Sequence, residues 1–199
     1  MDEVREKSIL LIGPTNSNKS IIANLLSEKT NMPTISLDTS REKYYCDLNY
    51  DKEYANKLKR ENGELARYEY NKPFEAHYIS TFLDNIPESS IIKFESTQTV
   101  YEQPELFAKV YNCISKFANV ILLLPDIDLQ DCWQQINKTC KIPVGSDLSK
   151  LNWHLVSSPC NSSLATYTVY MCGRDKEEIT DEILDYINNK TKENARQIA

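Results

Sequence analysis

The sequence predicts an α/β domain in which a five-stranded parallel sheet lies between two layers of helices. Five short apolar runs alternate with longer segments of helical periodicity, a pattern typical of repeated strand–helix units. The run 120–124 is entirely apolar, as expected of a central parallel strand covered on both faces. No repeat or linker divides the 199 residues, and we therefore expect a single domain over residues 1–199.

The expected elements follow from the positions of the apolar residues. Strands are predicted at residues 8–12, 33–37, 91–94, 120–124 and 167–171. Apolar side chains recur at helical spacing after the first, third, fourth and fifth strands. The polar, tyrosine-rich region after the second strand extends to Asn85 and is expected to be helical in two or three pieces. Residues 139–163 look irregular, with one short helix near 148–155.

Composition and charge exclude several classes of protein. The net charge of −6 leaves no general basic surface for nucleic acid, and the longest apolar stretch, 120–124, is far too short to span a bilayer. The six cysteines form no Cys-x-x-Cys pair and fit no zinc-site spacing. Together with an N-terminus that lacks a secretory profile, these features predict a cytoplasmic protein with reduced thiols and no nucleic-acid or membrane partner.

Residues 13–20, with the sequence GPTNSNKS, carry the strongest local signal. They follow a predicted strand, open a predicted helix, and match the phosphate-loop pattern Gly-x-x-x-x-Gly-Lys-Ser/Thr at three of its four fixed positions. Backbone N–H groups would surround the β-phosphate of a nucleotide, Lys19 would reach the β- and γ-phosphates, and Ser20 would bind Mg²⁺. The expected nucleotide-binding residues are Gly13, Thr15, Asn16, Ser17, Asn18, Lys19, Ser20 and Ile21. A strand-to-helix turn that binds nothing is the alternative.

Asparagine replaces glycine within this loop. The chain has only four glycines, and Asn18 stands where the pattern has its second glycine. Asn16 occupies a position where many small kinases carry another. Asparagine is one of the few other residues that enter the left-handed backbone region at modest cost, so we expect the loop shape to survive.

With this loop, the chain resembles the shikimate-kinase-like P-loop proteins. The stretches Lys72–His77 and Val120–Pro125 resemble a subgroup often labelled shikimate-kinase-like, and the resemblance covers nearly the whole chain. It implies a three-layer sandwich of the P-loop kinase type, with a parallel sheet in the order 2-3-1-4-5. It also implies ATP-dependent phosphorylation of a small molecule's hydroxyl group.

The resemblance also suggests roles for residues near the acceptor. Shikimate kinases carry Asp-x-Asp at the end of the second strand, where this chain keeps only Asp38. Asp38 would accept the proton of the acceptor hydroxyl and lie near the metal, or it would cap the following helix. Arg41 would bind an anionic acceptor or lie at the surface. Glu95, at the end of the third strand, would contact a polyol or hold Mg²⁺ through water, unless it forms a structural ion pair.

Two further regions complete the expected site. Residues of about 38–88 would cover the acceptor, with Tyr45 and Glu75 among the contacts, although half-buried helix faces also explain the tyrosines. Residues of about 138–163 would form a lid. This lid contains lysines but no arginine, because the chain has none between Arg67 and Arg174. A lysine can serve as a point charge but lacks the bidentate fork of arginine.

The positions at which a Walker-B acid would be sought are also altered. Lys93 occupies the third strand, where such an acid might have been expected. Asp126 and Asp128 follow Pro125 and fit a helix start better.

We therefore expect an ATP-dependent kinase that uses Mg²⁺ and a small hydroxylated substrate, such as a sugar, polyol, nucleoside or secondary metabolite. Lys19 and Asp38 would be its catalytic residues, and Ser20 and Asp38 its metal ligands. The alternative is a degenerate P-loop protein that binds a nucleotide, another ligand or a protein partner without efficient phosphoryl transfer. The acceptor's identity, the choice between ATP and GTP, and the oligomeric state stay open.

Overall fold

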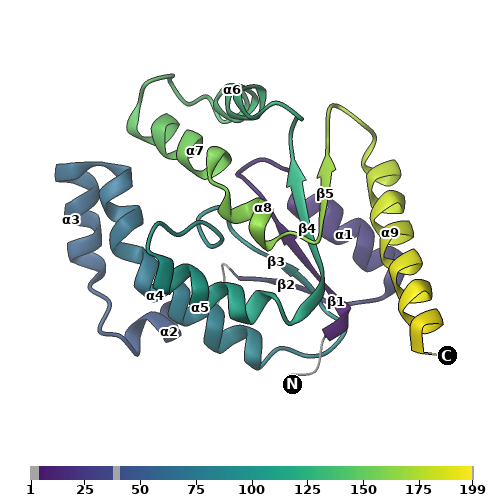
Figure 1. Cartoon of the computed structure of the whole chain (residues 1–199). Helices are drawn as coiled ribbons and strands as arrows, with labels where there is room; N and C mark the ends of the chain where they lie inside the picture. The colour runs from purple at the N-terminus through teal and green to yellow at the C-terminus, as the bar shows by residue number, and fades with distance from the viewer. Residues whose placement is uncertain (1–4, 38–40, 199) are drawn as a thin grey trace.

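A five-stranded parallel sheet forms the centre of the protein (Figure 1). The structure is a computed structural model that describes residues 5–37 and 41–198. The strands are β1 (Arg5–Ile12), β2 (Thr34–Ser36), β3 (Ile91–Lys93), β4 (Phe117–Leu124) and β5 (Tyr167–Tyr170). Their order is β2-β3-β1-β4-β5, and every neighbouring pair is parallel. The predicted fold class and strand order are confirmed.

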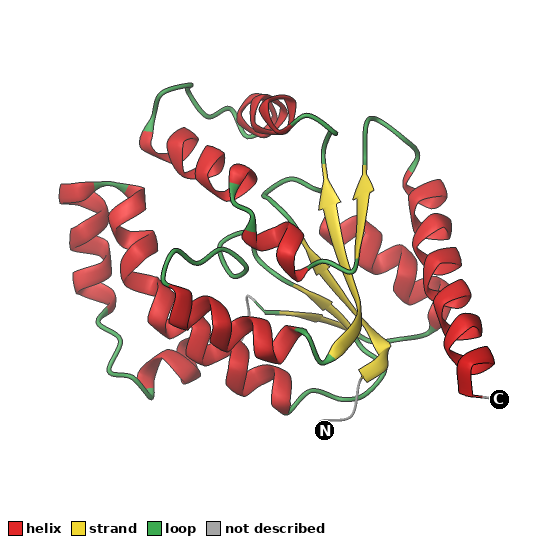
Figure 2. Cartoon of the chain, viewed as in Figure 1, coloured by secondary structure: helices red, strands yellow, loops and turns green. Residues whose placement is uncertain are grey.

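Helices surround this sheet and connect its strands (Figure 2). They are α1 (Lys19–Thr30), α2 (Arg41–Cys46), α3 (Lys52–Asn62), α4 (Glu64–Asp84), α5 (Pro104–Ile114), α6 (Leu129–Thr139), α7 (Asp147–Ser157), α8 (Cys160–Leu164) and α9 (Lys176–Ile198). The tyrosine-rich region is helical in three pieces, α2 to α4, as predicted.

Alternation along the strands divides the core into two halves. In β1, Ile9 and Leu11 face one side and pack with apolar residues of α1 and α9. Leu10 and Ile12 face the other side, where α4, α5 and α6 cover the sheet. Because side chains of a strand alternate between its faces, a buried parallel strand needs apolar residues on both. The result is the three-layer arrangement expected from the sequence.

The region 139–163 is more regular than its sequence indicates. It contains α7 and α8, whereas we expected an irregular segment with one short helix. The side chain of Ser146 caps α7 by accepting a hydrogen bond from the Ser149 N–H. Leu151 and Leu155 of this helix are buried, so tertiary packing stabilises a helix whose sequence signal is weak.

Three further sequence-based expectations concern Asp128, the cysteines and membrane-spanning helices. Asp128 caps α6 by accepting hydrogen bonds from the backbone N–H groups of Gln130 and Asp131, which confirms its assignment to a helix start. All six cysteines are free thiols. Within residues 5–37 and 41–198, no helix has the length and apolar character needed to cross a membrane.

Candidate functional site

The loop between β1 and α1 contains three residues with positive φ angles. Asn16 and Asn18 have φ angles of 63° and 56°, so both lie in the left-handed region as predicted. Gly13 has φ of 136°, and a Cβ atom there would lie 2.3 Å from the carbonyl oxygen of Leu123. Asparagine thus stands at two positions of positive φ, whereas at Gly13 a close backbone contact adds to the demand for glycine.

Lys19 lies inside this loop. Its Nζ donates hydrogen bonds to the carbonyl oxygens of Gly13 (2.8 Å) and Pro14 (2.7 Å). Burial lowers the pKa of Lys19 to about 8; the negative charge of Glu95 opposes this shift and the positive charge of Lys93 adds to it. The loop thus encloses an ammonium group whose hydrogen-bond acceptors are carbonyl oxygens of the same loop.

Ser20, the motif serine, contacts a second lysine. Lys93 Nζ of β3 donates a hydrogen bond of 2.8 Å to Ser20 Oγ, which is the oxygen that we expected to bind Mg²⁺. The described residues contain no cluster of three or more acidic, histidine or cysteine side chains that could hold a metal ion. An ammonium group bonded to the expected metal ligand does not fit a divalent cation. Asp38, the other expected ligand, lies outside the described residues.

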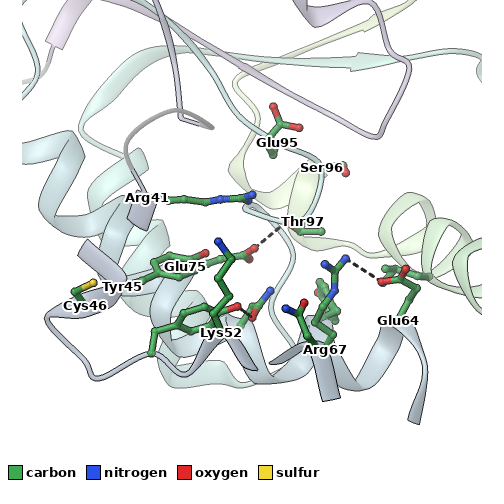
Figure 3. A pocket seen from close by; sticks show the side chains of 15 residues that line it. Arg41, Tyr45, Cys46, Lys52, Glu64, Arg67, Glu75, Glu95, Ser96 and Thr97 are labelled. Atoms are coloured by element: carbon green, nitrogen blue, oxygen red, sulfur yellow. Dashed lines mark hydrogen bonds and ion pairs between the residues drawn. The ribbon is translucent and has the colours of Figure 1, made fainter. Parts of the chain in front are cut away.

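A cavity of about 630 Å³ adjoins the loop at the carboxyl end of the sheet (Figure 3). The four described residues predicted to bind the acceptor, Arg41, Tyr45, Glu75 and Glu95, all line it. Figure 3 shows Arg41 reaching across this cavity. The other lining residues are Cys46, Tyr50, Lys52, Asn56, Glu64, Arg67, Tyr68, Asn71, Ser96, Thr97 and Leu151.

The segment 95–97 connects the loop with the cavity. Its three residues line the cavity, and the hydroxyl of Ser96 lies 2.9 Å from that of Thr15 in the loop. Glu95 also acts on the loop electrostatically, since its charge favours the protonated form of Lys19. A ligand in the cavity and a phosphate in the loop would therefore meet at this segment.

Glu75 is held rigidly in the cavity wall. Lys72 Nζ donates a hydrogen bond of 2.6 Å to its carboxylate, and the Thr97 hydroxyl donates another of 2.9 Å. Lys72 and Glu75 are only 2% and 4% exposed. The ammonium of Lys72 also lies 4.1 Å and 4.5 Å from the ring centroids of Tyr68 and Tyr101, where cation–π attraction contributes further.

Three tyrosines, Tyr45, Tyr50 and Tyr68, supply both aromatic surface and hydroxyl groups to the cavity. Burial and the nearby charge of Glu75 raise the pKa of Tyr45 well above its ordinary value, so its hydroxyl stays protonated. The Tyr50 hydroxyl donates to Asn71 Oδ1 at 3.1 Å, and that of Tyr68 donates to the Val100 carbonyl at 2.9 Å. These contacts fix the ring positions at the cavity wall.

Comparison with known proteins finds likeness in structure alone. No protein-family model and no curated protein sequence matches the chain. The shikimate kinase of Acinetobacter baumannii in complex with shikimate aligns with a TM-score of 0.59 and 14% identity, over 92% of this chain and 94% of that one. The chain has the shikimate-kinase fold. The enzyme from Aquifex aeolicus aligns with a TM-score of 0.57 and 18% identity, over 92% of this chain and 98% of that one.

A gluconokinase from Sinorhizobium meliloti shares the same fold. It aligns with a TM-score of 0.56 and 13% identity, over 98% of this chain and 99% of that chain. With identities of 13–18%, the three comparisons show a shared fold.

The segment of about 138–163, expected to form a lid, carries the lysines Lys138, Lys141 and Lys150. Leu151 of α7 lines the cavity, whereas Lys138, Lys141 and Lys150 are not among the described lining residues. Lys150 lies 3.4 Å from Asp147 on its own helix. The apolar side chain of Leu151 adds no charge to the cavity wall.

Sequence reasoning missed three residues of the site. Lys72 precedes Glu75 by three positions, a spacing that places two side chains on one helix face and would have signalled their pairing. Arg67 lines the cavity and pairs with Glu64 at 2.9 Å. The contact of Lys93 with Ser20 had no local signal, because 73 positions separate the two residues.

Proposed function

We propose that this chain is a kinase that transfers the terminal phosphoryl group of ATP to a hydroxyl group of a small metabolite. The observation that carries this proposal is the shared segment 95–97, which joins a phosphate-type loop to a cavity of about 630 Å³. That volume is in the range of small-molecule sites. The similarity in fold to a shikimate kinase and a gluconokinase supports it.

The loop residues 13–21 would hold the nucleotide. Backbone N–H groups at the start of α1 suit the phosphates, since the N-terminus of a helix favours negative charge. Lys19 would leave its carbonyl partners to contact the β- and γ-phosphates, where its charge stabilises the transferred group. Negatively charged phosphate oxygens would offset the desolvation cost of the buried Lys19 ammonium better than neutral carbonyl oxygens do.

In the transfer step, the acceptor oxygen forms a bond to the γ-phosphorus. The bond between that phosphorus and the β–γ bridging oxygen breaks, and ADP leaves with the electron pair. The hydroxyl proton passes to a carboxylate, for which Asp38, which follows β2 in the sequence, is our candidate. No step is assigned to a metal ion, because the Ser20 hydroxyl that would bind it accepts a hydrogen bond from Lys93.

The cavity wall suits a polar acceptor with several hydroxyl groups. Glu75 and Glu95 would accept hydrogen bonds from hydroxyls, and protonated Tyr45 would donate one. Arg41 and Arg67 add positive charge for an anionic substituent. Sugars, polyols and nucleosides carry such groups, and flat aromatic side chains favour their rings.

A second candidate function is binding of a nucleotide without efficient transfer. Two observations favour it: Lys93 is bonded to Ser20, and no arginine occurs between Arg67 and Arg174 to neutralise the transferred group from the lid. The two candidates share the same ligand and differ only in whether ADP is formed when an acceptor is present.

Nucleotide binding is tested first, by thermal melting with millimolar ATP, GTP or ADP. Ligand binding to the folded state stabilises it by mass action, by about 2.7 kcal/mol at a hundredfold excess over Kd. We expect ATP to raise the melting temperature, Lys19→Ala to abolish that rise, and the exposed Lys109→Ala control to keep it. The absence of a shift with all three nucleotides would overturn both candidates.

Transfer is then tested by measuring ADP formation across a panel of sugars, polyols, nucleosides and other hydroxylated metabolites. We expect one class of acceptor to stimulate ADP formation and to yield a phosphorylated product by mass spectrometry. ATP binding without acceptor-dependent ADP formation over the whole panel would support the second candidate.

A further inference from the structure

The lysine on β3 occupies the place at which a metal ion would meet the phosphate loop. Ser20 is the serine of the loop motif, and its hydroxyl is the protein ligand through which such loops bind Mg²⁺. In this chain Ser20 Oγ lies 2.8 Å from the ammonium nitrogen of Lys93. This contact and its chemistry are independent of any assignment of the acceptor.

The position of Lys93 follows from the geometry of the sheet. β3 runs parallel to β1, with Lys93 opposite Leu11. Ile91 belongs to the half of the core that α1 covers, and Lys93, two residues further along the strand, points to the same face. It therefore emerges beside the first turn of α1, which contains Ser20. The lysine is placed there by the pleat of a buried strand rather than by a surface loop.

Charge around the loop is consistent with a fixed cation. Lys19 and Lys93 bring two positive charges to the phosphate site, and Lys93 is close enough to lower the pKa of Lys19. Glu95 contributes one negative charge to the same site. The three groups sum to a net charge of +1, which attracts a nucleotide that carries no bound metal more strongly than one already neutralised by a divalent ion.

We propose that the Lys93 ammonium takes over the place of the divalent cation, so that this chain binds nucleoside triphosphates in their metal-free form. The inference rests on the proposed nucleotide binding and deepens it. An ammonium has three N–H donors: one bonds Ser20, and the others can donate to oxygens of the β- and γ-phosphates. Such charge-assisted hydrogen bonds are among the stronger polar contacts in proteins.

The test measures ATP and inorganic tripolyphosphate binding by isothermal titration calorimetry, once in excess EDTA and once in excess MgCl₂. Tripolyphosphate reports on the phosphate site without any contribution from a base. We expect both probes to bind in EDTA at least as tightly as in MgCl₂. Binding that needs Mg²⁺ would overturn this inference and leave the proposed nucleotide site intact. Failure of both probes in both conditions would overturn the inference and the proposed function together.

Variants of Lys93 test the residue itself. Lys93→Met removes the charge at similar length, and we expect it to weaken binding of both probes in EDTA by about tenfold or more. Lys93→Asp introduces a carboxylate beside Ser20 and should make ATP binding depend on Mg²⁺. Lys109→Met, at an exposed position of α5, serves as the matched control. It should leave the affinity for both probes unchanged in EDTA and in MgCl₂. Unchanged affinity of Lys93→Met in EDTA would overturn the inference, and melting of each ligand-free variant verifies folding.

Discussion

The buried pair of Lys72 and Glu75 offers the sharpest test of how the cavity wall is held. Their side chains are 2% and 5% exposed, and Lys72 Nζ lies 2.6 Å from Glu75 Oε2. Lys72→Met keeps the apolar volume between the rings of Tyr68 and Tyr101 but leaves the carboxylate buried without its counter-charge. Removal of one partner from a buried ion pair costs about 3–5 kcal/mol, a large part of the roughly 5–15 kcal/mol that stabilises a domain.

The expected loss is measurable by urea unfolding and by calorimetry. For a chain of this length, each kcal/mol corresponds to about 2–4 °C in Tm, so Lys72→Met should melt roughly 6–20 °C below the wild type. Adding Glu75→Gln removes the orphaned charge, while the amide oxygen still accepts the Thr97 hydroxyl. The double variant should therefore recover most of the loss. The reasoning is wrong if the free energy of unfolding of Lys72→Met lies within about 1 kcal/mol of that of the wild type. It is also wrong if the double variant is no more stable than Lys72→Met.

Three further predictions concern the phosphate loop. Gly13→Ala should destabilise the protein by several kcal/mol in urea unfolding, since its Cβ would lie 2.3 Å from the Leu123 carbonyl oxygen at a φ of 136°; a loss under about 1 kcal/mol would contradict this. Asn18→Gly should bind ATP with equal or higher affinity in calorimetry, because glycine adopts the observed φ of 56° freely. A tenfold lower affinity would instead indicate that the Asn18 carboxamide contacts the ligand. ATP affinity should fall as pH rises through about 8, where Lys19 loses its proton. The ATP affinity of Lys19→Arg should not change over this pH range, because arginine stays charged. An equal dependence of affinity on pH in both proteins would refute the role of Lys19.

The positive φ angles of Asn16 and Asn18 in the loop 13–20 could be predicted from the sequence. The loop motif spans only eight positions, and its conformation depends on local backbone preferences. Asparagine tolerates the left-handed region, which explains why Asn16 and Asn18 were correctly predicted to preserve the loop shape. The strand order followed from resemblance to a known family, and the parallel sheet from its five alternating apolar runs.

The cavity was predicted only as a region. The family resemblance placed Arg41, Tyr45 and Glu75 near the acceptor, and the carboxyl end of the third strand placed Glu95 there. The structure brings all four to one cavity. Their roles in binding stay predictions. The i,i+3 spacing of Lys72 and Glu75 within α4 carries a signal for their pairing. The hydrogen bond from Thr97 to Glu75 has no such signal, since it depends on how α4 packs against the segment 95–97.

The sequence by itself determined the elements whose signals are short in range: the apolar strands, the helix periodicity and the loop of residues 13–20. Only the tertiary structure decided which polar groups far apart in the sequence meet. Lys93 reaches Ser20 across 73 positions, and Thr97 reaches Glu75 across 22. Strand register and side-chain alternation set these contacts, and a one-residue shift would turn Lys93 to the opposite face of the sheet. The charges beside the phosphate loop therefore depend on the packing of β1, β3 and α1.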